Sequence, residues 1–122
     1  MKVLLSIKPE FADKIFNGSK KYEFRKSIFR NSDVKTIIVY ASSPVQKVIG
    51  EFTIDMILEE QKEQLWSMTR EFSGISKAFF DDYFAQKDVG YAIKIGTVKR
   101  YIEPKRLNDL DIQYAPQSFI YL

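Results

Sequence analysis

With 122 residues, of which 45% are hydrophobic and 15% aromatic, the chain has enough apolar side chains to fold around a core of its own. It contains neither cysteine nor histidine, which excludes disulfides, thiol nucleophiles, histidine-dependent triads and the common zinc sites. The net charge of +3 is unevenly spread, because basic residues outnumber acidic ones ten to four in residues 1–50, whereas acidic ones prevail nine to four in residues 51–90. A basic first half favours a polyanionic partner, although small domains also acquire uneven charge without any function.

Neither a membrane segment nor a secretion signal is apparent. The longest strongly apolar run, residues 36–41, is far too short to cross a bilayer. The first nine residues lack the apolar stretch and the small-residue cleavage site of a signal peptide. We therefore expect a cytoplasmic protein without membrane contact. Since the spacing of a calcium-binding loop is missing too, we expect neither a metal nor another cofactor.

The first part of the chain predicts a strand, a short helix and a second strand. Alternating apolar residues indicate the first strand over residues 3–8. Pro9 suits the first helical turn, where its missing N–H leaves no donor unpaired, and the helix ends at Asn17-Gly18, where glycine can adopt a left-handed conformation. The second strand covers residues 20–26. Alternation gives it an apolar face with Tyr22 and Phe24 and a polar face with Glu23 and Arg25.

The middle of the chain predicts two strands and a helical insert. β-Branched residues indicate a buried strand over residues 35–41, and a long strand follows over residues 45–58. Gly50 inside the longer strand indicates a bulge or the close approach of another segment. A stretch of about residues 60–87 is predicted to form two helices, the second of them capped by Ser76.

The last part predicts two further strands, over residues 89–101 and 117–122, with Pro104 at the beginning of the connection between them. No repeat or linker interrupts the chain, so residues 1–122 are predicted to form a single domain. Its expected class is α+β: a curled, mostly antiparallel sheet with a short N-terminal helix and a two-helix insert.

A GxKxxExR pattern formed by Gly18, Lys20, Glu23 and Arg25 follows the first strand and helix. It resembles the signature of ASCH domains, which belong to the PUA-like superfamily of small β-barrels. Further segments are similar to small stand-alone bacterial and phage members of that family: residues 6–9, 40–44, 49–52 and 115–119. The resemblance implies a PUA-like β-barrel with a cleft beside the signature strand. It also implies binding of RNA or of a nucleotide-like ligand, in a role linked to the regulation of transcription or translation.

Enzymes also occur in this family. The small acetylcytidine amidohydrolases resemble the chain at Gly18, Lys20 and Arg25, and they combine the signature lysine with a threonine three residues later. The chain has Glu23 at that position, so the resemblance favours a binding module over an amidohydrolase. The alternative is a small hydrolase of a modified nucleoside or of RNA, in which Lys20 activates water or polarises the substrate and Glu23 is the proton-transfer partner. Nuclease activity is known in the family as well, and the resemblance assigns it to no particular residues of this chain.

Eight residues are candidates for binding a ligand or RNA: Lys8, Lys20, Glu23, Arg25, Tyr40, Ser42, Gln117 and Ser118. Lys8, Lys20 and Arg25 would contact phosphate or carbonyl oxygens, and Glu23 would hold Arg25 or accept from a base edge. Tyr40, at a strand end, is the candidate for stacking on a base. Each of the eight also has an ordinary structural interpretation, such as a solvated ion pair, a turn or a core position.

The predicted helical insert is acidic, which argues against its contacting phosphate. We expect it to shield the cleft or to bind a basic protein partner. Its aromatic residues are expected to cover one end of the barrel: Trp66, Phe79, Phe80, Tyr83 and Phe84.

Overall fold

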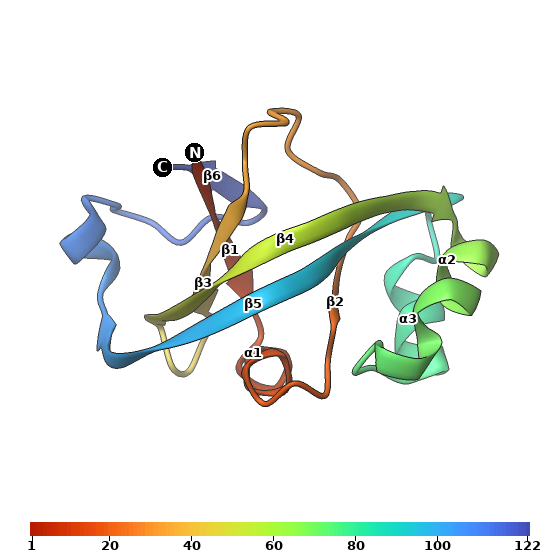
Figure 1. Ribbon diagram of the computed structural model, residues 1–122, viewed down its shortest axis with the longest axis horizontal. Helices are drawn as coiled ribbons and strands as arrows, with labels where there is room; N and C mark the ends of the chain where they lie inside the picture. The colour runs from red at the N-terminus through yellow and green to blue at the C-terminus, as the bar shows by residue number, and fades with distance from the viewer.

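A single mixed sheet of six strands curls into a half-barrel in the computed structural model, which describes residues 1–122 (Figure 1). The helices and strands, in chain order, are β1 (Lys2–Ile7), α1 (Pro9–Phe16), β2 (Tyr22–Arg25), β3 (Thr36–Ala41), β4 (Lys47–Gln61), α2 (Lys62–Thr69), the 3-10 helix η1 (Arg70–Phe72), α3 (Lys77–Tyr83), β5 (Val89–Lys105), the 3-10 helix η2 (Leu107–Leu110) and β6 (Phe119–Tyr121). The strand order is β2-β5-β4-β3-β1-β6, so β2 and β6 are the two outer strands. The α+β, PUA-like architecture predicted from the sequence is thereby confirmed.

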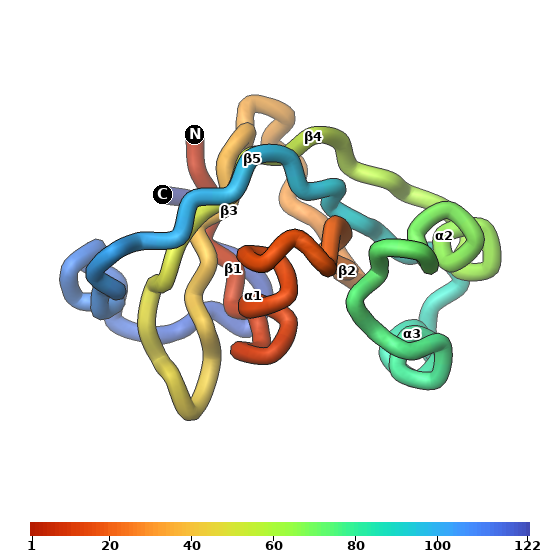
Figure 2. Tube along the Cα trace, turned by 60° about the horizontal axis from the view of Figure 1, so that its bottom comes forward, coloured from red at the N-terminus to blue at the C-terminus, as the bar shows by residue number.

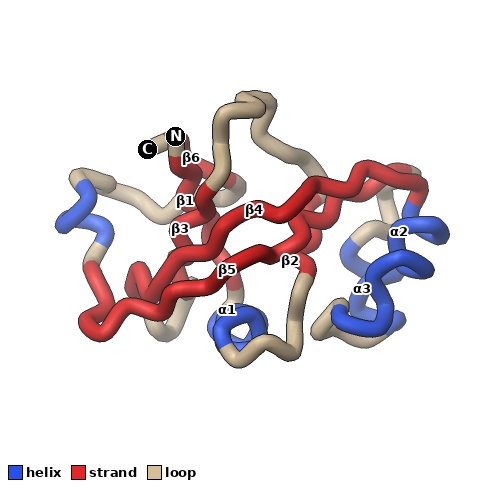
Figure 3. Tube along the Cα trace, viewed as in Figure 1, coloured by secondary structure: helices blue, strands red, loops and turns tan.

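Most strand pairs in the sheet are antiparallel. Strand β1 pairs with β3 in parallel, and the crossover between them contains α1 and β2. The long strands β4 and β5 form a ribbon across the molecule, with α2 and α3 at one end and η2 at the other (Figure 3). Figure 2 shows α2 and α3 beside each other at the far end of this ribbon. None of the helices is long and apolar enough to span a membrane.

Both faces of the central strands are buried, because alternate residues enter different core clusters. Ile37 and Val39 of β3 belong to the largest cluster, which also contains Ala12 and Ile15 of α1. Residues of the other parity, such as Ile38, pack in a second cluster with residues near η2. This double burial explains the uninterrupted β-branched run that predicted a buried strand here.

Several local predictions are confirmed by the backbone. Helix α1 begins at Pro9, and Gly18 after it has a φ of +88°, which favours glycine. The Ser76 side chain caps α3 by accepting from the backbone N–H of Phe79 at 3.0 Å. At Gly50 the register of β4 and β5 shifts, and a Cβ atom there would lie 2.6 Å from the carbonyl oxygen of Lys99, so both the bulge and the close approach are present.

Two local predictions are wrong. Pro104 does not begin a connection, because β5 continues through it to Lys105, which lies opposite Val48 of β4. The two-faced pattern of β2 is also incomplete, since Glu23 of the expected polar face is as buried as Phe24 of the apolar face, each being 6% exposed. The reason is that other segments of the protein cover β2 on both sides.

Candidate ligand-binding cleft

A cleft of about 490 Å³ opens between the end of β1, helix α1, strand β2, helix α3 and the segment before β6. Its polar lining consists of Ser6, Lys8, Lys20, Glu23, Arg25, Lys26, Ser27, Gln117 and Ser118. Its apolar lining consists of Ile7, Phe11, Phe24, Ile75, Phe79 and Tyr83. The volume lies within the usual range of small-molecule sites. The signature strand β2 thus forms one wall, as the resemblance implied.

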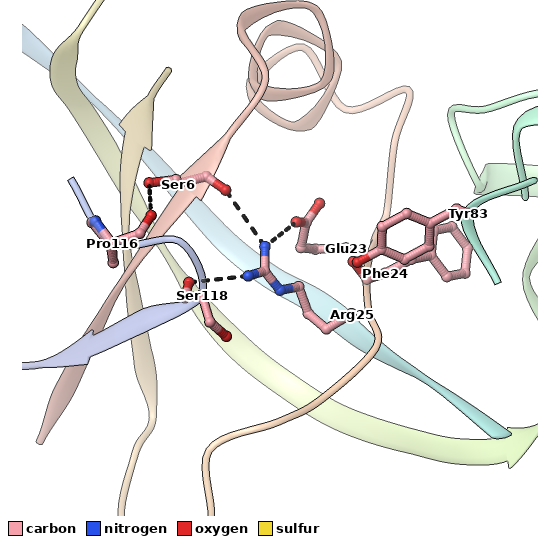
Figure 4. A network of polar contacts seen from close by, with 7 residues as sticks. All are labelled: Ser6, Glu23, Phe24, Arg25, Tyr83, Pro116 and Ser118. Atoms are coloured by element: carbon pink, nitrogen blue, oxygen red, sulfur yellow. Dashed lines mark hydrogen bonds and ion pairs between the residues drawn. The ribbon is translucent and has the colours of Figure 1, made fainter. Parts of the chain in front are cut away.

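Arg25 connects strands at opposite edges of the curled sheet (Figure 4). Its Nη2 donates to the carbonyl oxygen of Ser118, just before β6, at 3.0 Å. Its Nη1 lies 3.4 Å from both the carbonyl oxygen of Ser6 in β1 and Oε2 of Glu23. The Ser6 hydroxyl in turn donates to the carbonyl oxygen of Pro116 at 2.8 Å. Because β2 and β6 are the outer strands, these bonds hold the two edges of the half-barrel together beside the cleft.

Glu23 is a buried carboxylate on the same wall. Burial raises its pKa above the usual value, and the positive charges of Lys20 and Arg25 only partly oppose this shift. Arg25 supplies the hydrogen bond to Oε2, and the ion pair is largely shielded from water, with side-chain exposures of 13% for Arg25 and 8% for Glu23. A carboxylate in this setting has a higher proton affinity than one on the surface.

Lys20 lies two residues before β2 and is almost fully buried, with only 2% of it exposed. Its Nζ donates to the carbonyl oxygen of Ser73, between η1 and α3, at 2.6 Å. The ammonium also lies 4.9 Å from the ring centroid of Phe24 and 5.3 Å from that of Phe11. Burial lowers the pKa of Lys20 from 10.5 to about 8, against the opposing effect of Glu23.

The segment that covers Lys20 is fixed to the first third of the chain by two further bonds. Lys14 Nζ donates to the carbonyl oxygen of Gly74 at 3.0 Å, and the backbone N–H of Lys21 donates to the carbonyl oxygen of Phe72 at 2.9 Å. Gly74 has a φ of +69°, and a Cβ atom there would lie 2.6 Å from Cβ of Lys20. The insert is therefore attached directly over the signature lysine.

Six of the eight candidate residues line this one cleft: Lys8, Lys20, Glu23, Arg25, Gln117 and Ser118. The structure does not bring the other two to it. Tyr40 is 6% exposed and packs in the second core cluster, with Leu4 and Ile112. Ser42 lies in the loop after β3, where its backbone N–H donates to the carbonyl oxygen of Ile7 at 3.0 Å.

The sequence reasoning missed the aromatic wall of the cleft. The expected single group of insert aromatics divides between two faces of α3: Phe80 and Phe84 are buried against Phe24, whereas Phe79 and Tyr83 line the cleft. The spacing contained a signal for this, because residues four apart share a helix face and neighbouring residues do not. Lys26 also lines the cleft, and nothing in the sequence distinguished it from other lysines.

The chemistry of the cleft rests on nitrogen cations, one carboxylate and aromatic rings. No group of three or more histidine, cysteine, aspartate or glutamate side chains in the structure is arranged to hold a metal ion. The lowered pKa of Lys20 makes its ammonium a stronger acid than usual, and the raised pKa of Glu23 makes its carboxylate a stronger base than usual, on neighbouring parts of one wall.

Comparison with known proteins identifies relatives over the full length of the chain. A protein of Zymomonas mobilis named "ASCH domain-containing ribonuclease" is 30% identical over 122 residues, which cover 98% of this chain and 82% of that protein. The crystal structure of ASCH from Zymomonas mobilis has a TM-score of 0.90 at 30% identity and covers 99% of this chain and 87% of its own. The large ribosomal subunit protein uL22 of Ureaplasma parvum is 28% identical over 120 residues, and the chain spans only 39% of its length.

The family model that matches this chain is the ASCH domain, over residues 5–106. This range includes the whole signature and all strands of the sheet except the outer strand β6 and the first residues of β1. The chain belongs to the ASCH domain family.

Proposed function

We propose that the chain binds RNA, or a nucleotide-like ligand, in the cleft beside β2. The observation that carries this proposal is the convergence of Lys8, Lys20, Lys26 and Arg25 on one concave site that also has aromatic walls. Cations attract phosphate, and aromatic rings offer stacking surfaces to bases. The relative named a ribonuclease supports RNA as the ligand class. The proposal includes a role in regulating transcription or translation, which the resemblance to the family implies.

The four cations differ in what they can offer a ligand. Lys8 and Lys26 are exposed at the rim, so their ammonium groups are free to contact phosphate. Arg25 uses three of its five N–H donors on protein oxygens, which leaves only two for a ligand. Lys20 is held beneath the insert by Ser73. We therefore assign phosphate contacts chiefly to Lys8 and Lys26, and the positioning of Glu23 chiefly to Arg25.

Salt dependence of binding tests this proposal. Affinity for a short single-stranded RNA should fall as salt rises, and the slope of log affinity against log salt should weaken by about 0.7 for each phosphate contact removed. A Lys8→Gln/Lys26→Gln double variant should show this weaker salt dependence. Lys77→Gln, which removes an exposed lysine of α3 that does not line the cleft, should keep the wild-type slope. Wild-type affinity without salt dependence, or a double variant that binds like wild type, would contradict the proposal.

A second candidate function, hydrolysis of RNA or of a modified nucleoside, is favoured by one observation. The pKa of Lys20 is lowered to about 8, closer to neutral pH than usual, and burial raises the pKa of Glu23, which makes its carboxylate a stronger base than one on the surface. Proton transfer is most effective when the pKa values of acid and base lie near the working pH. In such a hydrolase Glu23 would accept a proton from the attacking hydroxyl or water, and the Lys20 ammonium would polarise the substrate or protonate the leaving atom, which is an oxygen in RNA and a nitrogen in an acetylated cytidine.

Turnover separates the two candidates. RNA and acetylated cytidine are incubated with the wild type and with Lys20→Met, and products are followed by chromatography. Cleavage that Lys20→Met abolishes while RNA affinity persists would establish the hydrolase. If the wild type binds RNA but turns over neither substrate, the binding module stands alone.

A further inference from the structure

Helix α3 presents two neighbouring aromatic rings to the cleft. Phe79 and Tyr83 are half-buried lining residues, whereas Phe80 and Phe84 of the same segment are 1% and 0% exposed. Core packing accounts for the second pair completely. Tyr83 also packs against this cluster, at 4.8 Å between its ring centroid and that of Phe84, but Tyr83 and Phe79 both keep exposed area that lines the cleft where the cations converge.

Both accessible rings are held in fixed positions. Their planes are nearly parallel, at 13°, with centroids 6.4 Å apart. The edge of Phe11 meets Phe79 at a centroid distance of 5.2 Å and an angle of 82°. The Tyr83 hydroxyl donates to the carbonyl oxygen of Phe24 at 3.3 Å, which anchors that ring to β2. A rigid ring loses little freedom when a flat ligand stacks on it.

The two rim lysines lie over these same rings. Lys8 Nζ is 5.3 Å from the ring centroid of Phe79, and Lys26 Nζ is 4.7 Å from that of Tyr83. Contacts of exposed ammonium groups with aromatic faces are weak. Since each lysine has a long flexible stem, it can leave its ring and still reach the oxygens of a ligand bound in the cleft.

We propose that Phe79 and Tyr83 form the base-stacking platform of the cleft, and that Lys8 and Lys26 move from these rings to the adjoining phosphates when single-stranded RNA binds. This inference rests on the proposed function and specifies it, since it assigns base contact to the helical insert and phosphate contact to the ends of β1 and β2. It replaces Tyr40, which is buried in the core, as the stacking residue. It also gives the insert a direct role in binding despite its acidic character, because stacking requires no positive charge.

Replacing each ring by leucine, which keeps an apolar side chain but removes the stacking surface, tests the platform. Phe79→Leu and Tyr83→Leu should each weaken binding of a short oligoadenylate, measured by fluorescence anisotropy, by about fivefold or more, because stacking contributes that much per base in other single-strand binders. The salt dependence of binding should stay unchanged, since no phosphate contact is lost. Tyr114→Leu, which removes an exposed ring outside the cleft, is the matched control and should leave affinity unchanged.

A probe without bases tests the same inference on the unaltered protein. The wild type should bind an abasic oligonucleotide of equal length at least about fivefold more weakly than the oligoadenylate, and the two leucine variants should lose this preference. Equal wild-type affinity for the two probes would overturn the platform while leaving RNA binding intact, even if a leucine variant failed to fold. Absence of wild-type binding to both probes would instead refute the proposed function itself, and the platform with it.

Discussion

Replacing Lys20 by methionine tests whether burial lowers the pKa of this lysine. The substitution keeps an unbranched side chain between the rings of Phe11 and Phe24 but removes the ammonium group. In the wild type the unfolded chain binds a proton at Lys20 up to a pH near 10.5, whereas the folded protein releases it near pH 8. Between these values the unfolded state binds more protons, so the free energy of unfolding must rise with pH.

The size of the effect follows from the pKa shift. From about pH 8 to pH 10 the folded protein has lost the Lys20 proton and the unfolded chain still holds it. Each pH unit in this interval raises the free energy of unfolding by about 1.4 kcal/mol, so Lys20 should add about 2–3 kcal/mol between pH 7 and pH 10. Lys20→Met lacks this contribution. The loss of the hydrogen bond to Ser73 and the removal of a buried charge oppose each other at neutral pH, so the pH dependence is more informative than any single value.

Urea unfolding of the two proteins at a series of pH values between 7 and 10 provides the measurement. The stability of the wild type should rise relative to that of Lys20→Met across the series, and most of the rise should lie above pH 8. Lys77→Met is the matched control, because that ammonium is exposed and its loss should leave the curve parallel to that of the wild type. Parallel curves for the wild type and Lys20→Met would refute the conclusion that burial governs this lysine.

Three other substitutions have defined outcomes. Because the pKa of Glu23 is raised, the folded wild type holds the carboxyl proton at pH values where the unfolded chain has lost it. The free energy of unfolding of the wild type should therefore rise relative to that of Glu23→Gln as the pH is lowered from 7 towards 4.5, measured by urea unfolding. Arg25→Lys loses the forked contacts to Ser118 and neighbouring oxygens and should lower the free energy of unfolding by about 1–3 kcal/mol, and an unchanged value would show that these contacts do not hold the half-barrel edges. Gly50→Ala places a Cβ atom 2.6 Å from the backbone oxygen of Lys99, which cannot easily move, and should destabilise the protein by about 1–3 kcal/mol in thermal or urea unfolding, whereas wild-type stability would argue against the close approach.

The elements of the fold were predictable because their signals are local. Pro9 at the first helical turn, Gly18 after α1 and Ser76 at the start of α3 each act within one helical turn, and each has the predicted role. The bulge at Gly50 is similar, since glycine weakens the interior of a long strand and is typical there of a bulge or of a close backbone approach. At each of these positions the residue that determines the local backbone conformation lies within a few residues of the turn, cap or bulge that it forms.

The exposure of individual side chains was not predictable, because distant segments determine it. Lys20 is bonded beneath the carbonyl of Ser73, which follows it by 53 positions, and Tyr40 packs in a cluster with Leu4 and Ile112, which lie far before and after it in the sequence. Alternation along β2 correctly separates Glu23 from Phe24 but cannot show that both faces are covered. Alternation of polar and apolar residues predicts exposure only if one face of the strand is open to solvent. That condition fails for β2, because other segments cover both of its faces.

The burial of Lys20 and the contacts of Arg25 together change what the GxKxxExR signature signifies in this chain. Gly18 supplies a turn with positive φ, Lys20 fixes the insert through Ser73, and Arg25 joins the two edges of the half-barrel. Lys20 and Arg25 thus hold together walls of the cleft, Gly18 shapes the turn that precedes them, and Glu23 has no structural task beyond its bond to Arg25. A signature of this kind predicts the presence and shape of the cleft better than its chemistry, because the same scaffold can be lined by different side chains. Differences in function among proteins with this signature should therefore reside in residues outside it that reach the cleft, such as the aromatic pair on α3.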